Sequence, residues 1–249
     1  MIITAERLDV TKLIYLNFNT SDPGIHEKAC ESAYSLWKNQ WIETFSDLDK
    51  TRHLTSDDFI DHELCGLFDG DKAVGFMLCK FMDLRLKSTF DILYFKNYPK
   101  SLIERNKTLQ DTIMIMSFMT LNPAWRKSFT NFSISELLIG FMVLRLNVSN
   151  SKRAIGYFRN NRSTNEIFYR HSGRFLLQDK AYNVEVDYAE TDPQTSTLSS
   201  FSSHALLNFK LWNEFYYNQR RKTYELERGP APRQSEQTGR RIPEPTLDQ

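Results

Sequence analysis

The sequence contains few of the residues from which disulfide frameworks and zinc sites are built. Its three cysteines, Cys30, Cys65 and Cys79, are widely spaced, no Cys-x-x-Cys pair occurs, and the five histidines are scattered. Zinc sites and disulfide frameworks need cysteines and histidines at closer, recurring spacings. We therefore predict that no metal is a cofactor, and that Cys65 and Cys79, which lie in apolar runs, are buried and unreactive.

An excess of one charge is also missing, and so are long apolar segments. Lys and Arg number 32 and Asp and Glu 31, which gives a formal net charge of +1. Such a balance provides no overall field to attract nucleic acid, and we predict no nucleic-acid partner. No uninterrupted apolar run reaches the roughly 18 residues of a membrane-spanning helix. Because Met1–Arg7 also lacks a basic region followed by an apolar run, we expect no signal peptide, no transmembrane segment and a cytoplasmic location.

Several common catalytic motifs are absent as well. No glycine-rich dinucleotide loop, P-loop, Gly-x-Ser-x-Gly elbow or His-Glu-x-x-His pair occurs. Each of these motifs sets a reactive or phosphate-binding group at a fixed spacing, so the sequence carries no signature of the commonest dehydrogenases, nucleotide hydrolases, serine hydrolases or metalloproteases. What is present is 249 residues that are 41% hydrophobic, with 18 Phe and 11 Tyr. That composition is typical of one well-filled globular domain with extensions.

Apolar spacing and turn residues predict a mixed order of helices and strands. Apolar residues recur at helical spacing over 25–46, and the runs Glu63–Phe68 and Ala73–Met82 flank a Gly-containing turn typical of a β-hairpin. Thr112–Leu121 is apolar on both faces, as expected for a central strand covered on both sides. Serines followed three residues later by a glutamate predict helix starts, and they occur at Ser101, Ser133 and Ser163.

From these starts we predict helices that extend to about positions 111, 147 and 173. Ala154–Phe158 reads as a short strand, and 175–188 alternates like a strand pair. The order predicts an α/β domain in which helices cover a mixed central sheet. We assign this domain to 1–190, followed by a Ser/Thr-rich linker at 191–202, an amphipathic helix at 203–227 and a disordered tail at 228–249.

Two motifs lie on either side of the helix that begins at Ser133. The first, Leu121-Asn122-Pro123-Ala124-Trp125-Arg126, follows the central strand. The second is Tyr169 with Gly173 and Phe175 behind it, and Asn160 and Asn161 ahead of it. In order and spacing these motifs resemble the acyl-donor half of the GCN5-related N-acetyltransferase (GNAT) fold, over about 60–188. The resemblance implies a GNAT-like mixed central sheet flanked by helices, here with an added C-terminal helix.

The resemblance also implies where a thioester donor would bind. In the family the central strand splays away from its neighbour and pairs with the donor's pantetheine arm, which here points to Met119 and Leu121. The phosphates would lie against the loop Arg126, Lys127, Ser128 and Phe129 and the helix start behind it, because unpaired N–H groups and the helix dipole attract anions.

This loop departs from the family pattern Pro-x-x-Arg-Gly-x-Gly. Lys127 and Phe129 stand at the glycine positions, where the family uses the missing Cβ to bring backbone close to phosphate. Either the donor is held differently or it is not CoA, and an acyl carrier protein with its single phosphodiester is the alternative. A solvated basic loop without a ligand is the third interpretation.

In many members of the family the tyrosine protonates the departing thiolate, which implies Tyr169 as general acid and Asn160 or Asn161 as pantetheine contacts. Alternatively, Tyr169 packs against the sheet with its hydroxyl at the rim. No general base stands out, since the candidate carboxylates are interpreted as caps or solvated groups rather than as bases. They are Asp91, Glu104 and Asp111.

Together the motifs predict an N-acyltransferase. It would move an acyl group from acetyl-CoA, a longer acyl-CoA or an acyl carrier protein thioester to a small-molecule or protein amine. The aromatic residues Phe90, Tyr94, Phe95 and Tyr98 in the segment 84–111 suggest an acyl chain longer than acetyl. The competing hypothesis is a non-catalytic, GNAT-derived module that binds a partner through its C-terminal helix. The acceptor and the oligomeric state are left open.

Overall fold

The computed structural model describes residues 9–48, 54–96, 98–125, 132–171, 173–181, 183–196, 198 and 203–228. The chain divides into two compact units, one up to Phe215 and one from Tyr216 onward. The strands are β1 (Ile14–Asn19), β2 (Glu63–Asp69), β3 (Lys72–Asp83), β4 (Thr112–Leu121), β5 (Arg153–Arg159), β6 (Arg174–Ala181) and β7 (Val184–Thr191). The helices are α1 (Glu27–Leu48), α2 (Leu93–Lys96), α3 (Lys100–Leu109), α4 (Ile134–Val148), α5 (Thr164–Arg170) and α6 (Ser203–Arg228).

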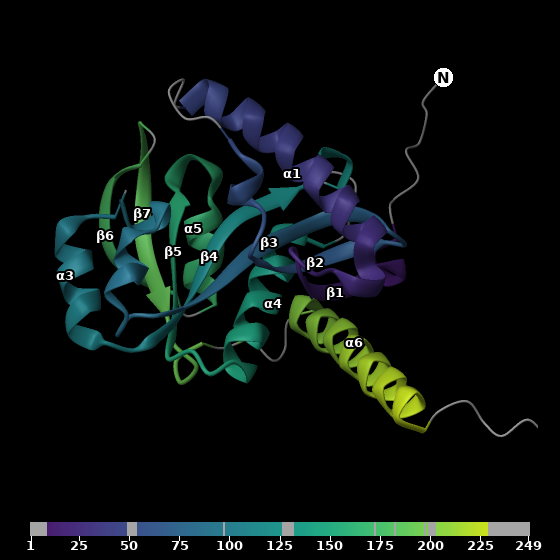
Figure 1. Ribbon diagram of the computed structural model, residues 1–249. Coiled ribbons are helices and arrows are strands. Elements are labelled where there is room, and N and C mark those ends of the chain that lie inside the picture. The colour runs from purple at the N-terminus through teal and green to yellow at the C-terminus, as the bar shows by residue number, and fades with distance from the viewer. Residues whose placement is uncertain are drawn as a thin grey trace, which may run out of the picture. The chain divides into compact units, whose positions relative to one another are not determined.

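The seven strands form one sheet in the order β1-β2-β3-β4-β5-β7-β6 (Figure 1). All neighbouring pairs are antiparallel except β4 and β5, which run parallel at the centre. A parallel pair needs a long crossover, and α4 provides it between β4 and β5. The sheet is therefore mixed, as the sequence predicted.

The boundaries follow the sequence closely where local signals are strong. The predicted hairpin is β2 and β3, and the predicted central strand coincides with β4. Ser133 caps α4 as predicted, because its Oγ accepts a hydrogen bond from the Glu136 N–H at 3.3 Å. The backbone N–H of Ser133 donates to His204 Nε2 at 3.0 Å instead of to the Glu136 carboxylate that a full capping box requires.

Two of the predicted caps were wrong, and one strand was missed. Ser101 lies inside α3, which begins directly after Pro99. Ser163 has a φ of +54° and makes no capping bond, since an N-cap needs an extended backbone. β1 was not predicted because Asn17 interrupts its short apolar run. In the structure the Asn17 side chain is bonded to the neighbouring strand, since its Nδ2 donates to Glu63 Oε1 on β2 at 2.6 Å.

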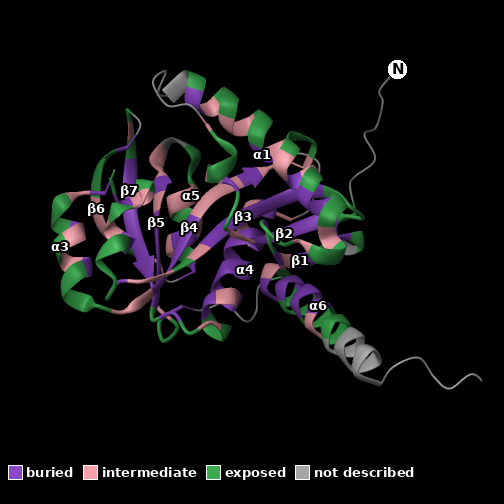
Figure 2. Ribbon diagram, in the orientation of Figure 1, coloured by how far each residue is buried: buried purple, intermediate pink, exposed green. Residues whose placement is uncertain are grey.

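The buried residues are concentrated on the central strands and on α4 (Figure 2). α4 is apolar around most of its circumference, which is expected for a helix covered on more than one side. The three cysteines are buried free thiols, as predicted for Cys65 and Cys79. Burial raises the pKa of the Cys30 thiol to about 11, so this group is protonated at neutral pH.

The part of α6 up to Phe215 packs on the core of the first unit. The ring of Tyr15 on β1 stacks on Phe141 of α4 at 4.2 Å between centroids, and Trp212 and Phe215 each lie 5.3 Å from the same ring. Five apolar side chains of this segment are buried, namely Ala205, Leu207, Leu211, Trp212 and Phe215. The apolar face that the sequence offered for a partner is thus covered in part within the unit as far as Phe215, while Leu206 and Phe209 are exposed.

A glycine on α4, Gly140, allows Asn208 of α6 to lie directly against the helix. Asn208 is buried and its Nδ2 donates to the carbonyl of Leu137 at 2.8 Å. A Cβ on Gly140 would come within 2.8 Å of Asn208 Cγ, too close for an ordinary contact.

Within the predicted linker, Ser196 is buried and its hydroxyl donates to Asn147 at 3.0 Å. No helix in the described part of the chain is long and apolar enough to cross a membrane.

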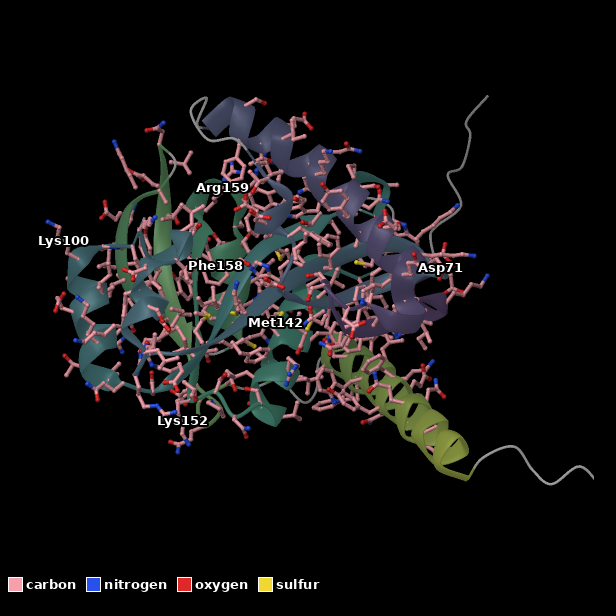
Figure 3. All side chains as sticks on the ribbon, in the orientation of Figure 1. Asp71, Lys100, Met142, Lys152, Phe158 and Arg159 are labelled. Atoms are coloured by element: carbon pink, nitrogen blue, oxygen red, sulfur yellow. The ribbon has the colours of Figure 1, made fainter. Side chains whose placement is uncertain are left out.

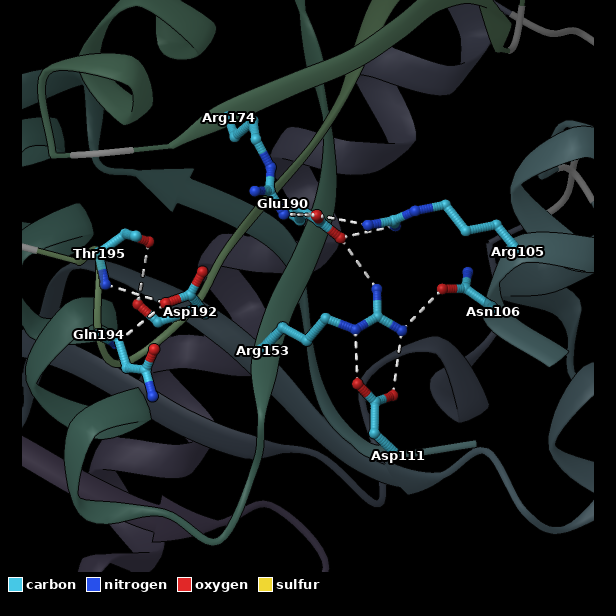
Figure 4. Close-up of polar contacts among 9 residues, drawn as sticks. All are labelled: Arg105, Asn106, Asp111, Arg153, Arg174, Glu190, Asp192, Gln194 and Thr195. Carbon is cyan, nitrogen blue, oxygen red and sulfur yellow. Dashed lines mark hydrogen bonds and ion pairs between the residues drawn. The ribbon is translucent and has the colours of Figure 1, made fainter. Parts of the chain in front are cut away.

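Arg153, the first residue of β5, is the centre of a buried polar network (Figure 4). Its guanidinium donates to both oxygens of Asp111 just before β4, at 2.7 and 3.0 Å. It also donates to Glu190 of β7 at 2.9 Å and to Asn106 of α3 at 2.9 Å. One side chain therefore connects β5 to β7, to α3 and to the residue that leads into β4.

Glu190 accepts from two further arginines and is almost completely buried, with 1% of its surface exposed. Arg105 donates to it at 2.6 and 2.7 Å, and Arg174 donates to the same carboxylate. Burial alone would raise the pKa of Glu190, but the bonds from Arg105, Arg174 and Arg153 outweigh it and lower the pKa to about 2. The ionised form is therefore favoured by folding.

We predict that Glu190→Gln lowers the free energy of unfolding at pH 7 by roughly 3 kcal/mol, because three arginines lose their buried counter-charge. A lowered folded-state pKa gives stability above pH 4.5 that is lost as pH falls towards 2. The difference between wild type and variant should therefore shrink over that range in urea unfolding. Glu104→Gln, which removes an exposed pair with Lys107, is the control and should cost less than about 1 kcal/mol. Equal stability of Glu190→Gln and wild type at pH 7 would contradict the assignment.

Candidate functional site

β4 and β5 pair over only three residues and then separate. Ile113–Ile115 pair with Arg153–Ile155, whereas β4 beyond Ile115 pairs only with β3, and β5 beyond Ile155 only with β7. Each backbone carries a donor and an acceptor that need partners when shielded from water. Between the two strands, past Ile115 and Ile155, the facing backbone edges have no partner strand in the described part of the chain. This splay can accept an extended ligand that supplies amide groups.

β4 carries a bulge in the part of the strand that borders the splay. Phe118 has a φ of +50°, and the register with β3 shifts there, since Ser117 pairs with Leu78 but Thr120 pairs with Phe76. A positive φ in an aromatic residue costs free energy, and such strained residues concentrate at functional sites. Bulges also re-aim neighbouring side chains. The strained backbone at Phe118 therefore marks this part of β4 as a candidate functional position.

Helix α1 stabilises the bulge from one face of the sheet. Trp41 Nε1 donates to Thr120 Oγ1 at 3.0 Å, and Thr120 Oγ1 donates to the Phe118 carbonyl at 2.8 Å. The Phe118 ring also lies edge-on to the rings of Trp41 and Trp37, at 5.1 and 5.7 Å. Gln40 Oε1 accepts from the Leu121 N–H at 3.2 Å. Residues about 80 positions away thus fix the end of β4.

A cavity of about 650 Å³ opens at the splay. This volume lies within the roughly 300–1,000 Å³ typical of small-molecule sites. The side chains and backbone of 115–119 line it from β4, and Tyr157–Arg159 line it from β5. One lobe is apolar and includes Ile92, Tyr94 and Val186, with the rings of Tyr94 and Tyr157 stacked at 5.5 Å. A second part of the lining is polar and includes His62, Arg159 and Arg162.

His62 is the imidazole in this lining. Its Nδ1 lies 3.0 Å from the Ile60 carbonyl, which assigns the proton to Nδ1 and leaves Nε2 as an acceptor. Burial lowers the pKa of His62 below its ordinary 6.5, and the charge of Lys80 lowers it further, against smaller raising effects of Asp58 and the backbone. Thr20 holds the His62 backbone, since its Oγ1 and its N–H donate to the His62 carbonyl at 2.9 Å each. His62 is therefore neutral at pH 7.

Arg159 and Arg162 line the cavity at the end of β5. Figure 3 labels Arg159 beside Phe158, whose ring stacks on Phe168 of α5 at 4.5 Å. Successive side chains of a strand point to opposite faces, so Arg159 projects to the face opposite α5. The residues Ser135 and Thr164, from the starts of α4 and α5, also contribute to the lining.

Tyr169 is not among the residues that line this cavity. Its hydroxyl donates to Asp187 Oδ2 on β7 at 2.7 Å, and Asn165 Nδ2 donates to the same oxygen at 2.8 Å. Burial and the carboxylate of Asp187 both raise the pKa of Tyr169, so its hydroxyl keeps its proton across the physiological range. The tyrosine holds α5 against β7 in this structure.

Of the other residues proposed from the sequence, some line the cavity, some lie in the turn after β5 and some are outside the described residues. Met119 and Leu121 line the cavity. Asn160 and Asn161 lie in the turn directly after β5, and the Oδ1 of Asn160 is buried without a hydrogen-bond partner. Arg126, Lys127, Ser128 and Phe129 lie outside the described residues. No group of three or more potential metal ligands occurs in the described part of the chain.

Four aromatic residues suggested an acyl pocket, and one of them lines the cavity. Tyr94 does so, whereas Phe95 and Tyr98 are buried in the apolar cluster behind it, against which Tyr94 and Phe90 both pack. Sequence analysis missed His62, Arg159 and Arg162, which occur singly between β-prone segments. It also missed the contacts of α1 with the end of β4, because residues so far apart in sequence carry no local signal.

The chain matches no protein-family model and no curated protein. Among solved structures, BjaI, a CoA-dependent acyl-homoserine lactone synthase solved with SAM and isopentyl-CoA, gives a TM-score of 0.54 at 13% identity, over 80% of this chain and 90% of that one. The same synthase with MTA gives the same values. An acetyltransferase of the GNAT family from Streptococcus pneumoniae gives 0.43 at 13% identity, over 72% and 98%. With its mixed sheet, flanking helices and added C-terminal helix, the chain has the GNAT-like fold that the sequence predicted.

We predict that Thr120→Val lowers the free energy of unfolding by about 1–3 kcal/mol, because the half-buried Trp41 N–H loses its acceptor. Urea unfolding measures the change. The matched background is Trp41→Phe, which already lacks this N–H. There the cost of Thr120→Val should be smaller, as expected for coupled groups. The same cost in both backgrounds would show that the hydrogen bond does not support the bulge.

Proposed function

We propose that the protein is an acyltransferase that moves an acyl group from a thioester donor to an amine. The observation that carries the proposal is the splay between β4 and β5, with its bulge at Phe118 and the 650 Å³ cavity beside it. A pantetheine arm contains two amides in an extended chain. Such a chain can pair with exposed strand edges as a peptide does when it adds to a sheet. The donor is a CoA or acyl carrier protein thioester in this proposal.

The apolar lobe supports an acyl group longer than acetyl. Ile92, Tyr94 and Val186 face the cavity beside Tyr157, and burying each further methylene of a chain there gains about 0.8 kcal/mol. Acetyl would leave this lobe empty. The proposed acceptor is a small amine that enters between the lobe and the polar part of the lining.

The reaction needs a base for the amine. In the proposed step the amine nitrogen forms a bond to the thioester carbon, the carbon–sulfur bond breaks, the nitrogen loses a proton and the thiolate gains one. His62 is the proposed base because it is neutral and has a free acceptor at Nε2. Its strand neighbour Lys80 pairs with Ile115 of β4, which places His62 two strand spacings, roughly 10 Å, from β4. A chain of bridging waters would carry the proton over that distance.

Tyr169 remains the proposed proton donor to the thiolate, as the resemblance implies. Its hydroxyl is protonated at neutral pH, which a donor requires, and would have to exchange Asp187 for the sulfur. The competing role is structural, through the bond to Asp187. The alternative of a non-catalytic module has less support, because Ala205, Trp212 and Phe215 of α6 are buried within the unit and only part of the apolar face, with Leu206 and Phe209, is exposed there.

The proposed function is tested by titration and turnover with a panel of thioesters. We expect acyl-CoA or acyl carrier protein thioesters of medium chain length to raise the melting temperature by mass action and to release thiol when an amine is added. Tyr157→Trp should shorten the preferred chain without abolishing turnover, because the added ring fills the apolar lobe. Failure of every donor to bind the wild type would refute acyl transfer.

We predict that the acidic limb of the pH dependence of kcat/KM lies below pH 6.5, because the pKa of His62 is lowered and its neutral form persists to lower pH. Activity should fall as pH drops through that lowered pKa. In His62→Gln the rate should be lower and the limb absent. His26→Gln is the control, since His26 stacks on Phe18 and does not line the cavity. An unchanged limb in His62→Gln would rule out this base.

We predict that Tyr169→Phe slows transfer from alkyl thioesters by about 10²-fold or more but hardly affects aryl thioesters, whose thiolates leave without a proton. The measurement is kcat for two donors with the same acyl group. Asp187→Asn, which keeps the hydroxyl, is the matched control. If both donors are slowed equally, or only the melting temperature falls, Tyr169 has the structural role instead.

A further inference from the structure

Two arginines in the cavity differ from the other arginines whose side chains the structure describes. Six of those eight side chains pair with a carboxylate, namely Arg85, Arg105, Arg145, Arg153, Arg170 and Arg174. In the described part of the chain Arg159 and Arg162 have no such pair. The Nε of Arg159 is buried and has no hydrogen-bond partner.

An unpaired arginine costs free energy when it is shielded from water. Burial and the neighbouring charge of Arg162 both lower the pKa of Arg159, so the two cations are close enough to disfavour one another. Arg159 pairs with Val186, which lies between two carboxylates, and both are bonded elsewhere. Asp187 accepts from Tyr169 and Asn165, and Glu185 accepts from Gln178. An anion between the two guanidinium groups would relieve both costs.

The position of the pair suggests what the anion is. Arg159 ends the part of β5 that faces the splay, and Arg162 follows in the next turn. Both lie on the wall of the same cavity as the bulge at Phe118. A chain that pairs with the strand edges and leaves the splay at this end would pass the two arginines.

We propose that Arg159 and Arg162 form a subsite that binds an oxyanion carried by one of the substrates. Guanidinium groups bind phosphate and carboxylate oxygens in pairs of parallel hydrogen bonds. The inference rests on the proposed acyl transfer. The expected source is the phosphate at the end of the donor's pantetheine arm, and a carboxylate on the amine acceptor is the other source of the same chemistry.

The test compares substrates that differ only in the anion. For the donor, kcat/KM is measured with an acyl-pantetheine and the matching acyl-4′-phosphopantetheine, and for the acceptor with an amine and its carboxylate-bearing analogue. The wild type should prefer the anionic member of one pair by about ten- to hundred-fold, the usual range for charged hydrogen bonds. The double variant Arg159→Gln/Arg162→Gln should reduce that preference towards one.

Arg170→Gln is the matched control, because Arg170 lies on α5 and pairs with Glu136 outside the cavity. It should keep the preference of the wild type. The double variant should melt at the same or a higher temperature than the wild type, since it removes two charges that have no carboxylate partner among the described residues. This readout separates a binding role from a structural one.

Loss of the preference in the donor pair assigns the subsite to phosphate, and loss in the acceptor pair assigns it to carboxylate. If the double variant discriminates as the wild type does in both pairs, the inference is overturned. If the wild type binds no thioester at all, the proposed function fails separately. In that case calorimetric titration with inorganic pyrophosphate decides, because binding that the double variant lacks supports the subsite, and no binding to the wild type overturns it.

Discussion

The short parallel contact between β4 and β5 is the constraint on which the rest of the structure depends. Three paired residues on each strand hold the centre of the sheet together, and the strands diverge directly afterwards. So few pairs would be weak without support. Arg153 provides it at the closed end, where one guanidinium bonds Asp111, Glu190 and Asn106 (Figure 4). A rigid closed end allows the open end to remain unpaired without separating the two halves of the sheet.

The open end is maintained from both sides. On the β4 side the α1 residues Trp41 and Gln40 bond the strand where it bulges. On the β5 side, β7 pairs with the strand to its last residue, Arg159, so the gap cannot close by rearrangement of β5. The cavity then combines an apolar lobe, a neutral imidazole, the carboxylates of Glu43, Asp57 and Asp58, and two arginines that form no ion pair with any described residue. This combination suits a substrate with an apolar chain, an extended polar arm and an anion, which is the chemistry of an acylated phosphopantetheine.

Local sequence signals predicted the elements but not the site. The apolar run Thr112–Leu121 and the cap at Ser133 gave β4 and the start of α4, because both depend on residues adjacent in the chain. The bulge at Phe118 depends on Trp41, and the partner of Tyr169 is Asp187 across a strand. Such contacts are set by tertiary packing. The departures at Lys127 and Phe129 predicted either a donor held differently from the family pattern or a donor other than CoA. The subsite proposed at Arg159 and Arg162 is a place for the anion of such a donor.

Hydrogen exchange with a non-hydrolysable acyl-phosphopantetheine amide tests most directly whether the splay is the donor site. If the arm pairs with the facing strand edges, backbone amides in 116–121 and 156–162 should exchange more slowly when the ligand is bound. The edge strand β1 should be unchanged. Binding without protection in these two segments would contradict donor binding in the splay, whatever activity the protein has.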